Sequence, residues 1–166
     1  MKRALAALLT LITLTAVVPQ AGAVGLYGIY WDRDHTDEEG YGGGLKNSRP
    51  LTQALSWDGR VSYVDFSDSD LSVIPLESTL IGKLGLGYLG IGYGYYIFNG
   101  DGAPDNDFGW YYLVGIEFPV SKVAVFGEVR WLKLSADIDN PAPGTPGSVD
   151  LDSRTYHVGL SLNLSH

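Results

Sequence analysis

Residues 155–165 read Thr-Tyr-His-Val-Gly-Leu-Ser-Leu-Asn-Leu-Ser and show the periodicity on which the fold prediction depends. Its apolar residues take every second position from Tyr156 to Leu164, and small or polar residues take the positions between them. Successive side chains of a β-strand point to opposite faces, so the pattern predicts a strand with one apolar and one polar face. A strand of a soluble sandwich could carry the same pattern, so the rest of the chain must decide between the two.

The opposite end of the chain has the pattern of a secretory signal. Lys2 and Arg3 form a basic start, residues 4–18 are apolar apart from three threonines, and residues 21–23 (Ala-Gly-Ala) form a small-residue cleavage site. The apolar run is shorter than the roughly 20 residues that a spanning helix needs. We therefore expect residues 1–23 to be a cleaved signal peptide and residues 24–166 to form one barrel domain.

The composition excludes two classes of protein. The sequence contains no cysteine, which excludes a secreted domain stabilised by disulfides. Without residues 1–23, the chain keeps 19 acidic and 9 basic residues, a net charge of −10. Because binding to phosphates needs a basic surface, this charge argues against nucleic acid as a partner.

Seven further segments between these two ends alternate in the same way or combine glycine with aromatic residues. Together with the last stretch they give eight expected strands, at residues 24–32, 40–46, 54–66, 71–84, 86–98, 108–118, 123–137 and 155–165. In the first strand we favour Tyr27, Ile29 and Trp31 as the outward residues. Pro75 lies inside the fourth, and since proline cannot donate to a ladder, we expect a bulge there.

The connections and the charges both indicate a membrane barrel. Four connections (33–39, 67–70, 99–107 and 138–153) fall at one end, and three turns fall at the other, as in outer-membrane barrels. Fifteen of the 19 acidic residues lie in or beside those four connections, and the remaining four have inward parity. The sequence therefore predicts an all-β fold, an eight-stranded antiparallel up-and-down transmembrane β-barrel.

Signal peptide, eight alternating segments, Gly/aromatic strands and the ending Tyr156-His-Val-Gly-Leu-Ser-Leu-Asn-Leu164 resemble the small outer-membrane barrels of the OmpA/OmpX type. The resemblance implies a place in the outer membrane of a Gram-negative-type bacterium. It also implies contact with outer-membrane lipid and lipopolysaccharide, and insertion by the barrel-assembly machinery. Such proteins often end in an aromatic residue, whereas this chain ends Leu164-Ser165-His166.

Inward parity places charges of both signs in the lumen of the expected barrel. An eight-stranded barrel is just wide enough inside for side chains to fill it, and buried charges must pair. We predict an interior salt-bridge network that plugs the lumen, with a narrow gated ion path as the alternative. The predicted network comprises Lys46, Asp58, Arg60, Glu77, Glu117, Glu128, Arg130 and His157.

Aromatic residues near the strand ends predict two interfacial girdles, which are typical of membrane barrels. The girdle at the loop end comprises Trp31, Trp110, Tyr112, Trp131 and Tyr156, and the girdle at the turn end comprises Trp57 and Phe118.

Two motifs suggest chemistry, and neither is a strong signal. Residues 85–90 (Gly-Leu-Gly-Tyr-Leu-Gly) match the dinucleotide fingerprint but continue as a strand instead of opening a helix. His157, Ser161 and Glu128 suggest a hydrolase triad, since some small barrels modify lipid A. However, four strand residues separate His157 from Ser161 by about 13 Å, which leaves open only a serine on another strand.

The acidic loops could collect divalent cations, which prefer carboxylate oxygens, although no loop matches a calcium-binding spacing. The alternative is a solvated rim.

We expect no catalytic residue, no dedicated metal site and no cofactor. The predicted function is that of a non-enzymatic outer-membrane barrel with a plugged polar interior and acidic outer loops, supporting envelope integrity or surface interaction such as adhesion. A small pore, a lipid A-modifying enzyme and a soluble periplasmic sandwich or lipocalin-like barrel remain as alternatives.

Overall fold

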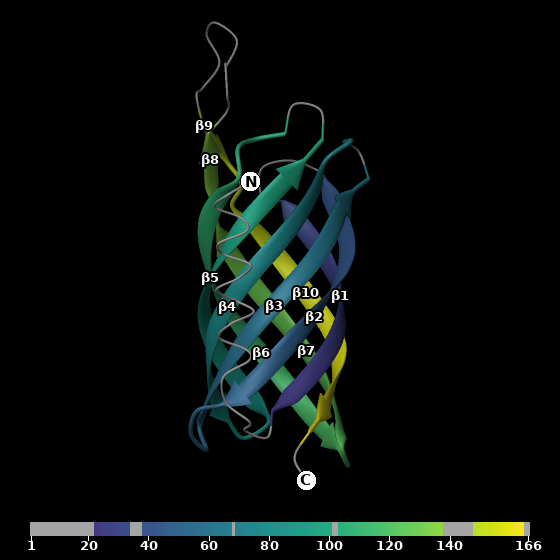
Figure 1. Cartoon of the computed structure of the whole chain (residues 1–166), viewed down its shortest axis with the longest axis vertical. Coiled ribbons are helices and arrows are strands. Elements are labelled where there is room, and N and C mark those ends of the chain that lie inside the picture. The colour runs from purple at the N-terminus through teal and green to yellow at the C-terminus, as the bar shows by residue number, and fades with distance from the viewer. Residues whose placement is uncertain (1–21, 34–37, 68, 101–102, 138–147, 165–166) are drawn as a thin grey trace, which may run out of the picture.

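The computed structural model describes residues 22–33, 38–67, 69–100, 103–137 and 148–164. Eight of its strands close into an antiparallel barrel in the order β1-β10-β7-β6-β5-β4-β3-β2 (Figure 1). Consecutive barrel strands are neighbours, and β10 closes the barrel against β1, as the sequence predicts. Among the described residues, none lies in a helix long and apolar enough to cross a membrane. The expected signal peptide falls almost wholly outside the described residues.

Each of the eight predicted segments overlaps one barrel strand, and each strand is 11 to 14 residues long. A tilted transmembrane strand needs about 9–11 residues, so every strand is long enough to span a bilayer. The barrel strands are β1 (Ala23–Arg33), β2 (Glu39–Pro50), β3 (Leu55–Phe66), β4 (Ser72–Leu84), β5 (Gly87–Asn99), β6 (Asp107–Val120), β7 (Val123–Lys133) and β10 (Ser153–Asn163).

The second strand is longer than predicted. Residues 47–50 (Asn-Ser-Arg-Pro) have the composition of a turn, yet they continue β2 and pair with residues 56–59 of β3. The turn follows at residues 51–54, where the hydroxyl of Thr52 accepts hydrogen bonds from the amides of Ala54 and Leu55. Pro50 ends the strand, where its missing amide hydrogen interrupts no ladder.

The bulge expected at Pro75 does not form. The pairs between β3 and β4 stop at Val61–Leu76 and resume at Val64–Val73 with no residue inserted on either strand. Pro75 itself lies opposite Tyr96 of β5. The missing amide hydrogen of Pro75 therefore coincides with a gap in the pairing between β3 and β4. The register of the two strands is the same on both sides of the gap.

A short ribbon extends the barrel at its loop end, where the sequence predicts the end of a strand and a loop. It consists of β8 (Ser135–Asp137) and β9 (Ser148–Asp150), which pair with each other above the rim (Figure 1). Below the ribbon, Leu134 and Leu151 are buried, and the amide of Leu151 donates to the carbonyl of Leu134 at 2.8 Å. These two leucines attach the fourth connection to the barrel interior.

The outward face predicted for the first strand is wrong. Tyr27, Ile29 and Trp31 are buried inside the barrel, and Val24 and Leu26 are exposed. Tyr27 fits because its neighbours across β2 and β10 are the inward glycines Gly44 and Gly159. A Cβ atom on Gly44 would lie 2.7 Å from the ring of Tyr27, so only glycine leaves room for it.

The same pairing of tyrosine with glycine recurs twice elsewhere in the lumen. A Cβ atom on Gly115 would lie 2.3 Å from the ring of Tyr88, and one on Gly92 would lie 2.5 Å from the ring of Tyr111. Each tyrosine thus fills the space that a glycine leaves on the neighbouring strand. The inward glycines are a packing requirement of a narrow tube filled with large side chains.

We expect Gly92→Ala to destabilise the barrel by about 1–3 kcal/mol, the usual cost of overpacking a filled interior. The added methyl group would meet the ring of Tyr111 and, at 2.7 Å, the backbone oxygen of Ser78. Gly127→Ala is the matched control, because nothing lies within 4 Å of its added Cβ atom. Denaturant unfolding in detergent or lipid measures both, and equal midpoints for the two variants would contradict the packing argument.

Candidate functional site

The lumen holds the largest set of buried charges, and the carboxylate of Glu128 lies at its centre. The two Nη atoms of Arg60 donate to the two oxygens of Glu128 at 2.6 and 2.9 Å. Arg130 donates through Nη2 at 3.0 Å, and the hydroxyl of Tyr88 donates at 2.8 Å. Glu128 therefore accepts hydrogen bonds from two guanidinium groups and one phenol, which come from strands β3, β5 and β7.

The network extends from both arginines to two further carboxylates. Arg130 donates through Nη1 to Glu77 at 2.8 Å, and the hydroxyl of Tyr96 donates to the other oxygen of Glu77 at 3.1 Å. Arg60 also donates to Asp58 at 2.8 Å. All of these charged residues are buried, so the ion pairs are shielded from water.

Lys46 lies in the lumen without joining the hydrogen-bonded network. Its ammonium group is 3.4 Å from the centre of the Phe126 ring, a cation–π contact, and its side chain is buried. Lys46, Arg60 and Arg130 supply three positive charges against the three negative charges of Asp58, Glu77 and Glu128. The three positive and three negative charges therefore balance, although Lys46 forms no hydrogen bond with the three carboxylates.

Glu117 lies apart from the buried network. It has the expected inward parity but lies near the turn end of β6. There its side chain is 30% exposed and forms an ion pair with Lys83 at 3.4 Å. An open cavity of about 40 Å³ at this end is bordered by Glu117 and Lys83 and also by Lys46 and Asp58. The predicted network is thus divided into a buried centre and a solvated pair at the turn end.

His157 is buried on β10 and does not form the geometry of a hydrolase triad. Its Nε2 atom forms a hydrogen bond with the hydroxyl of Thr155 at 3.1 Å, and its ring stacks on Tyr27 with centroids 5.1 Å apart. Its Nδ1 atom is buried and has no hydrogen-bond partner in the described part of the chain. Ser161 is also buried, and neither residue reaches the outer wall.

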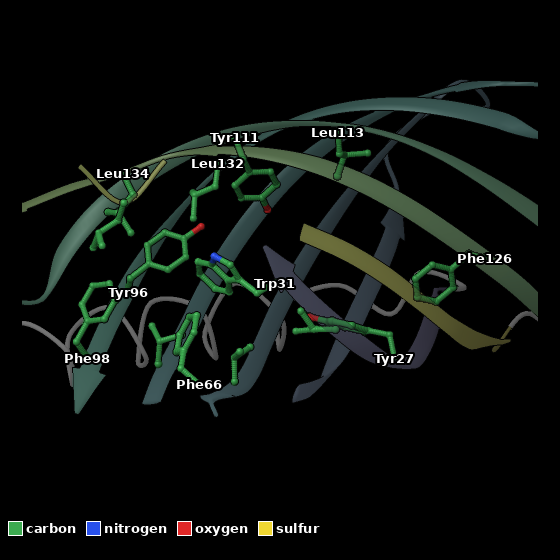
Figure 2. Close-up of a cluster of buried hydrophobic side chains, with 14 of the residues drawn as sticks. Tyr27, Trp31, Phe66, Tyr96, Phe98, Tyr111, Leu113, Phe126, Leu132 and Leu134 are labelled. Carbon is green, nitrogen blue, oxygen red and sulfur yellow. The ribbon is translucent and has the colours of Figure 1, made fainter. Parts of the chain in front are cut away.

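An aromatic and aliphatic layer, which the sequence pattern did not predict, fills the loop end of the lumen. Trp31 meets Phe66 edge to face with centroids 5.7 Å apart and Tyr96 at 6.2 Å. Figure 2 shows these three side chains together, with Phe98 and Leu134 beside them. Leu71 and Ala103, from two of the connections, pack against the buried hydrophobic cluster to which this layer belongs. The interior is therefore polar at its centre and apolar toward the loops.

Little empty space remains between the polar centre and this layer. A cavity of about 10 Å³ is bordered by Trp31, Glu77, Arg130 and His157, among others. That volume is about the minimum for one water molecule. The indole nitrogen of Trp31 is also buried without a hydrogen-bond partner among the described residues, so two residues that each carry an unpaired nitrogen, Trp31 and His157, border this cavity.

The outer wall carries exposed apolar side chains on every barrel strand. They include Leu26, Leu45, Val61, Leu80, Ile91, Ile116, Val125 and Leu160.

The residues of the two expected girdles occupy different positions. Trp110, Tyr112 and Phe118 are exposed on the wall, and Tyr112 stacks on the half-buried Trp131 at 5.1 Å. Tyr156 is half-buried on the wall. At the turn end, Trp57 donates through Nε1 to Ser78 at 2.8 Å.

Trp31 is the one member of the expected girdles that lies inside the barrel, so its predicted outward position is wrong. The wall at the loop end also carries Tyr30 and Tyr41, which are not members of the predicted girdles. Their hydroxyl groups both donate to the carboxylate of Glu39. Choosing the correct parity for the first strand would have placed Tyr30 on the wall.

Two rim acids form ion pairs with rim cations: Glu38 with Arg33, and Asp152 with Lys133. Several of the acidic loop residues, including Asp34, Asp37, Asp68 and Asp101, lie outside the described residues. Within the described residues, no cluster of three or more acidic or histidine side chains could hold a metal ion. The possible capture of divalent cations by the loops remains a prediction.

The dinucleotide fingerprint at residues 85–90 forms no nucleotide site. Gly85 and Leu86 make the two-residue turn between β4 and β5, and Gly85 takes a φ of 67°. The rest of the motif continues directly into β5, so the helix that this motif requires does not follow.

We expect Glu128→Gln to destabilise the barrel by about 3–5 kcal/mol, because removing one partner leaves buried guanidinium groups uncompensated. Glu117→Gln is the matched control, an identical change at an inward position on the neighbouring strand. Its ion pair with Lys83 is partly exposed, so its loss should cost about 1 kcal/mol or less. Unfolding followed by tryptophan fluorescence compares the two, and a similar loss for both would contradict the central role of Glu128.

No protein-family model matches the chain, and no curated protein matches its sequence. Solved structures, in contrast, match nearly all of it. The crystal structure of Neisserial surface protein A (NspA) superposes with a TM-score of 0.65 at 10% identity, covering 89% of this chain and 98% of that protein. The outer membrane protein Ail of Yersinia pestis, in a phospholipid bilayer nanodisc, gives a TM-score of 0.52 at 12% identity, covering 87% and 99%.

The N-terminal β-barrel domain of Pseudomonas aeruginosa OprF gives a TM-score of 0.50 at 11% identity, covering 85% of this chain and 96% of that domain. At such low identities these likenesses concern the fold. The resemblance to OmpA/OmpX-type barrels is confirmed at that level: the chain has the fold of the small eight-stranded outer-membrane β-barrels.

Proposed function

We propose that the protein is a non-enzymatic integral protein of the bacterial outer membrane, with a sealed lumen and with the four connections of its loop end facing outward. Its role is to support envelope integrity or surface interaction such as adhesion. The observation that carries this proposal is the division of side chains between the two faces of one sheet. Exposed apolar residues cover the wall, while charged and aromatic residues fill the tube.

This division fits a hydrocarbon solvent on the outside. A bilayer core contains no water to bind free backbone groups, and a closed barrel satisfies them all between strands. The tight turns β4–β5 and β6–β7 lie at the end opposite to the longer connections. In outer-membrane barrels the short turns face the periplasm and the longer loops face outward, which gives the proposed orientation.

The filled interior favours a sealed wall over the small pore. A path along the lumen would have to pass between the buried ion pairs of Arg60, Glu128 and Arg130 and then through the layer around Trp31. The buried position of His157 supports a non-enzymatic role over lipid A modification, because a catalytic residue must reach a substrate that lies outside the wall.

In planar bilayers, the purified protein should give no steady stepwise currents, because ion pairs and the aromatic layer fill its lumen. Trp31→Ala combined with Phe66→Ala removes two large rings from the loop-end layer but leaves the central ion pairs in place, so this variant should also give no steady current. Steady openings of the unaltered protein would overturn the sealed lumen and favour the pore.

After detergent extraction, the folded protein should migrate faster on an SDS gel before heating than after it, as closed membrane barrels resist unfolding by SDS. Cell fractionation should recover it with outer-membrane lipid. Recovery in the soluble periplasmic fraction would contradict the proposed location and favour the soluble barrel.

Unchanged mass spectra of lipid A, with and without the protein, check the absence of enzymatic activity.

A further inference from the structure

The outer wall at the loop end carries the carboxylate of Glu39 beside a row of three tyrosines. Tyr41 of β2, Tyr30 of β1 and Tyr156 of β10 are direct cross-strand neighbours. Their ring centroids are 5.4 Å apart between Tyr30 and Tyr41 and 5.8 Å apart between Tyr30 and Tyr156. With Glu39, which precedes Tyr41 by two positions on the same strand face, they form what we term the tyrosine–carboxylate patch.

The carboxylate of Glu39 is held in place by two of these tyrosines. The hydroxyl of Tyr30 donates to Oε1 at 2.9 Å, and the hydroxyl of Tyr41 donates to Oε2 at 2.6 Å. Each carboxylate oxygen can accept a further hydrogen bond, because it has two lone pairs. Glu39 and Tyr41 are both exposed, so this acceptor group and part of the ring row are accessible from outside the barrel.

Glu39 differs from its neighbours on the rim because it lacks a cation. Glu38 pairs with Arg33, and Asp152 pairs with Lys133. In the described residues, the side chain of Glu39 meets two phenols and forms no ion pair with a lysine or an arginine. Asp32 lies directly across from Glu39, and like charges in that position repel each other. Arg154 lies across from Asp32 on β10, one strand further away from Glu39.

We propose that the tyrosine–carboxylate patch binds an ammonium group, primary or quaternary, of the kind that phospholipid headgroups and small soluble amines carry. Aromatic faces attract cations, and clusters of aromatic rings recognise quaternary ammonium ligands. The carboxylate adds a fixed negative charge beside the rings. A divalent metal ion fits less well, because it needs several oxygen ligands and, among the described residues, no group of three acidic or histidine side chains could hold one.

The first test uses soluble probes and does not depend on the membrane location. The full-length protein is folded in micelles of a sugar detergent, which carries no amine, and backbone amides of residues 39–43 are followed by NMR. Choline should shift these signals in a saturable way. Its neutral isostere, 3,3-dimethylbutan-1-ol, has the same shape without the charge and should bind at least about tenfold more weakly.

Two variants locate the site, and one serves as a control. Glu39→Gln keeps the acceptor oxygen but loses the charge, and Tyr41→Phe keeps the ring but loses the hydroxyl that orients Glu39. Both should weaken choline binding, Glu39→Gln by about fivefold or more. Tyr93→Phe, at an exposed tyrosine of β5, should change nothing. Equal binding of choline and its isostere, or full binding by Glu39→Gln, would overturn the proposal.

The second test identifies the source of the amine and rests on the proposed membrane location. Nanodiscs that contain phosphatidylethanolamine with phosphatidylglycerol are compared with nanodiscs of phosphatidylglycerol alone. Shifts of the same amides in the first lipid, lost in Glu39→Gln, support a lipid headgroup as the ligand. Choline binding without a lipid effect supports a soluble amine. Failure of the barrel to insert into nanodiscs would refute the membrane location and leave the choline result standing.

Discussion

The carboxylate of Glu128 is the one group on which the interior of this barrel depends. It accepts hydrogen bonds from Arg60, Arg130 and Tyr88, and through the two arginines it connects to Glu77 and Asp58. These residues come from β3, β4, β5 and β7, so the polar network joins half of the strands across the tube. Desolvating so many charges is expensive, and only mutual pairing within the lumen offsets that cost.

Most of the architecture follows from the sequence, because the pattern has a period of two. Where small or polar residues alternate with apolar ones, as on β10, the sequence predicts which side chains face inward. On β1 both sets of positions contain large aromatic residues, and hydrophobicity alone cannot choose between Tyr27 and Tyr30. Space decides instead: Gly44 and Gly159 on the neighbouring strands leave room for Tyr27, and this pairing exists only once the register is formed.

The interior is the part that sequence reasoning describes least well. Parity identifies the inward charges, but it does not show that Glu117 lies at an open end or that Glu128 is shared. The layer of Trp31, Phe66 and Tyr96 is also hidden, because its members are distant in sequence and resemble residues of an interfacial girdle. Leu71 and Ala103 pack against the buried cluster that includes this layer, so two of the connections are attached to the barrel from within.

The fit of large rings over glycines constrains how this sequence can change over generations. At Gly92 and Tyr111, or at Gly115 and Tyr88, a side chain can grow on one strand only if its neighbour shrinks on the next. Each pair therefore behaves as one inherited unit of fixed total volume. Among diverging descendants, we expect these positions to exchange large for small in concert, while lipid-facing sites such as Gly127 drift independently.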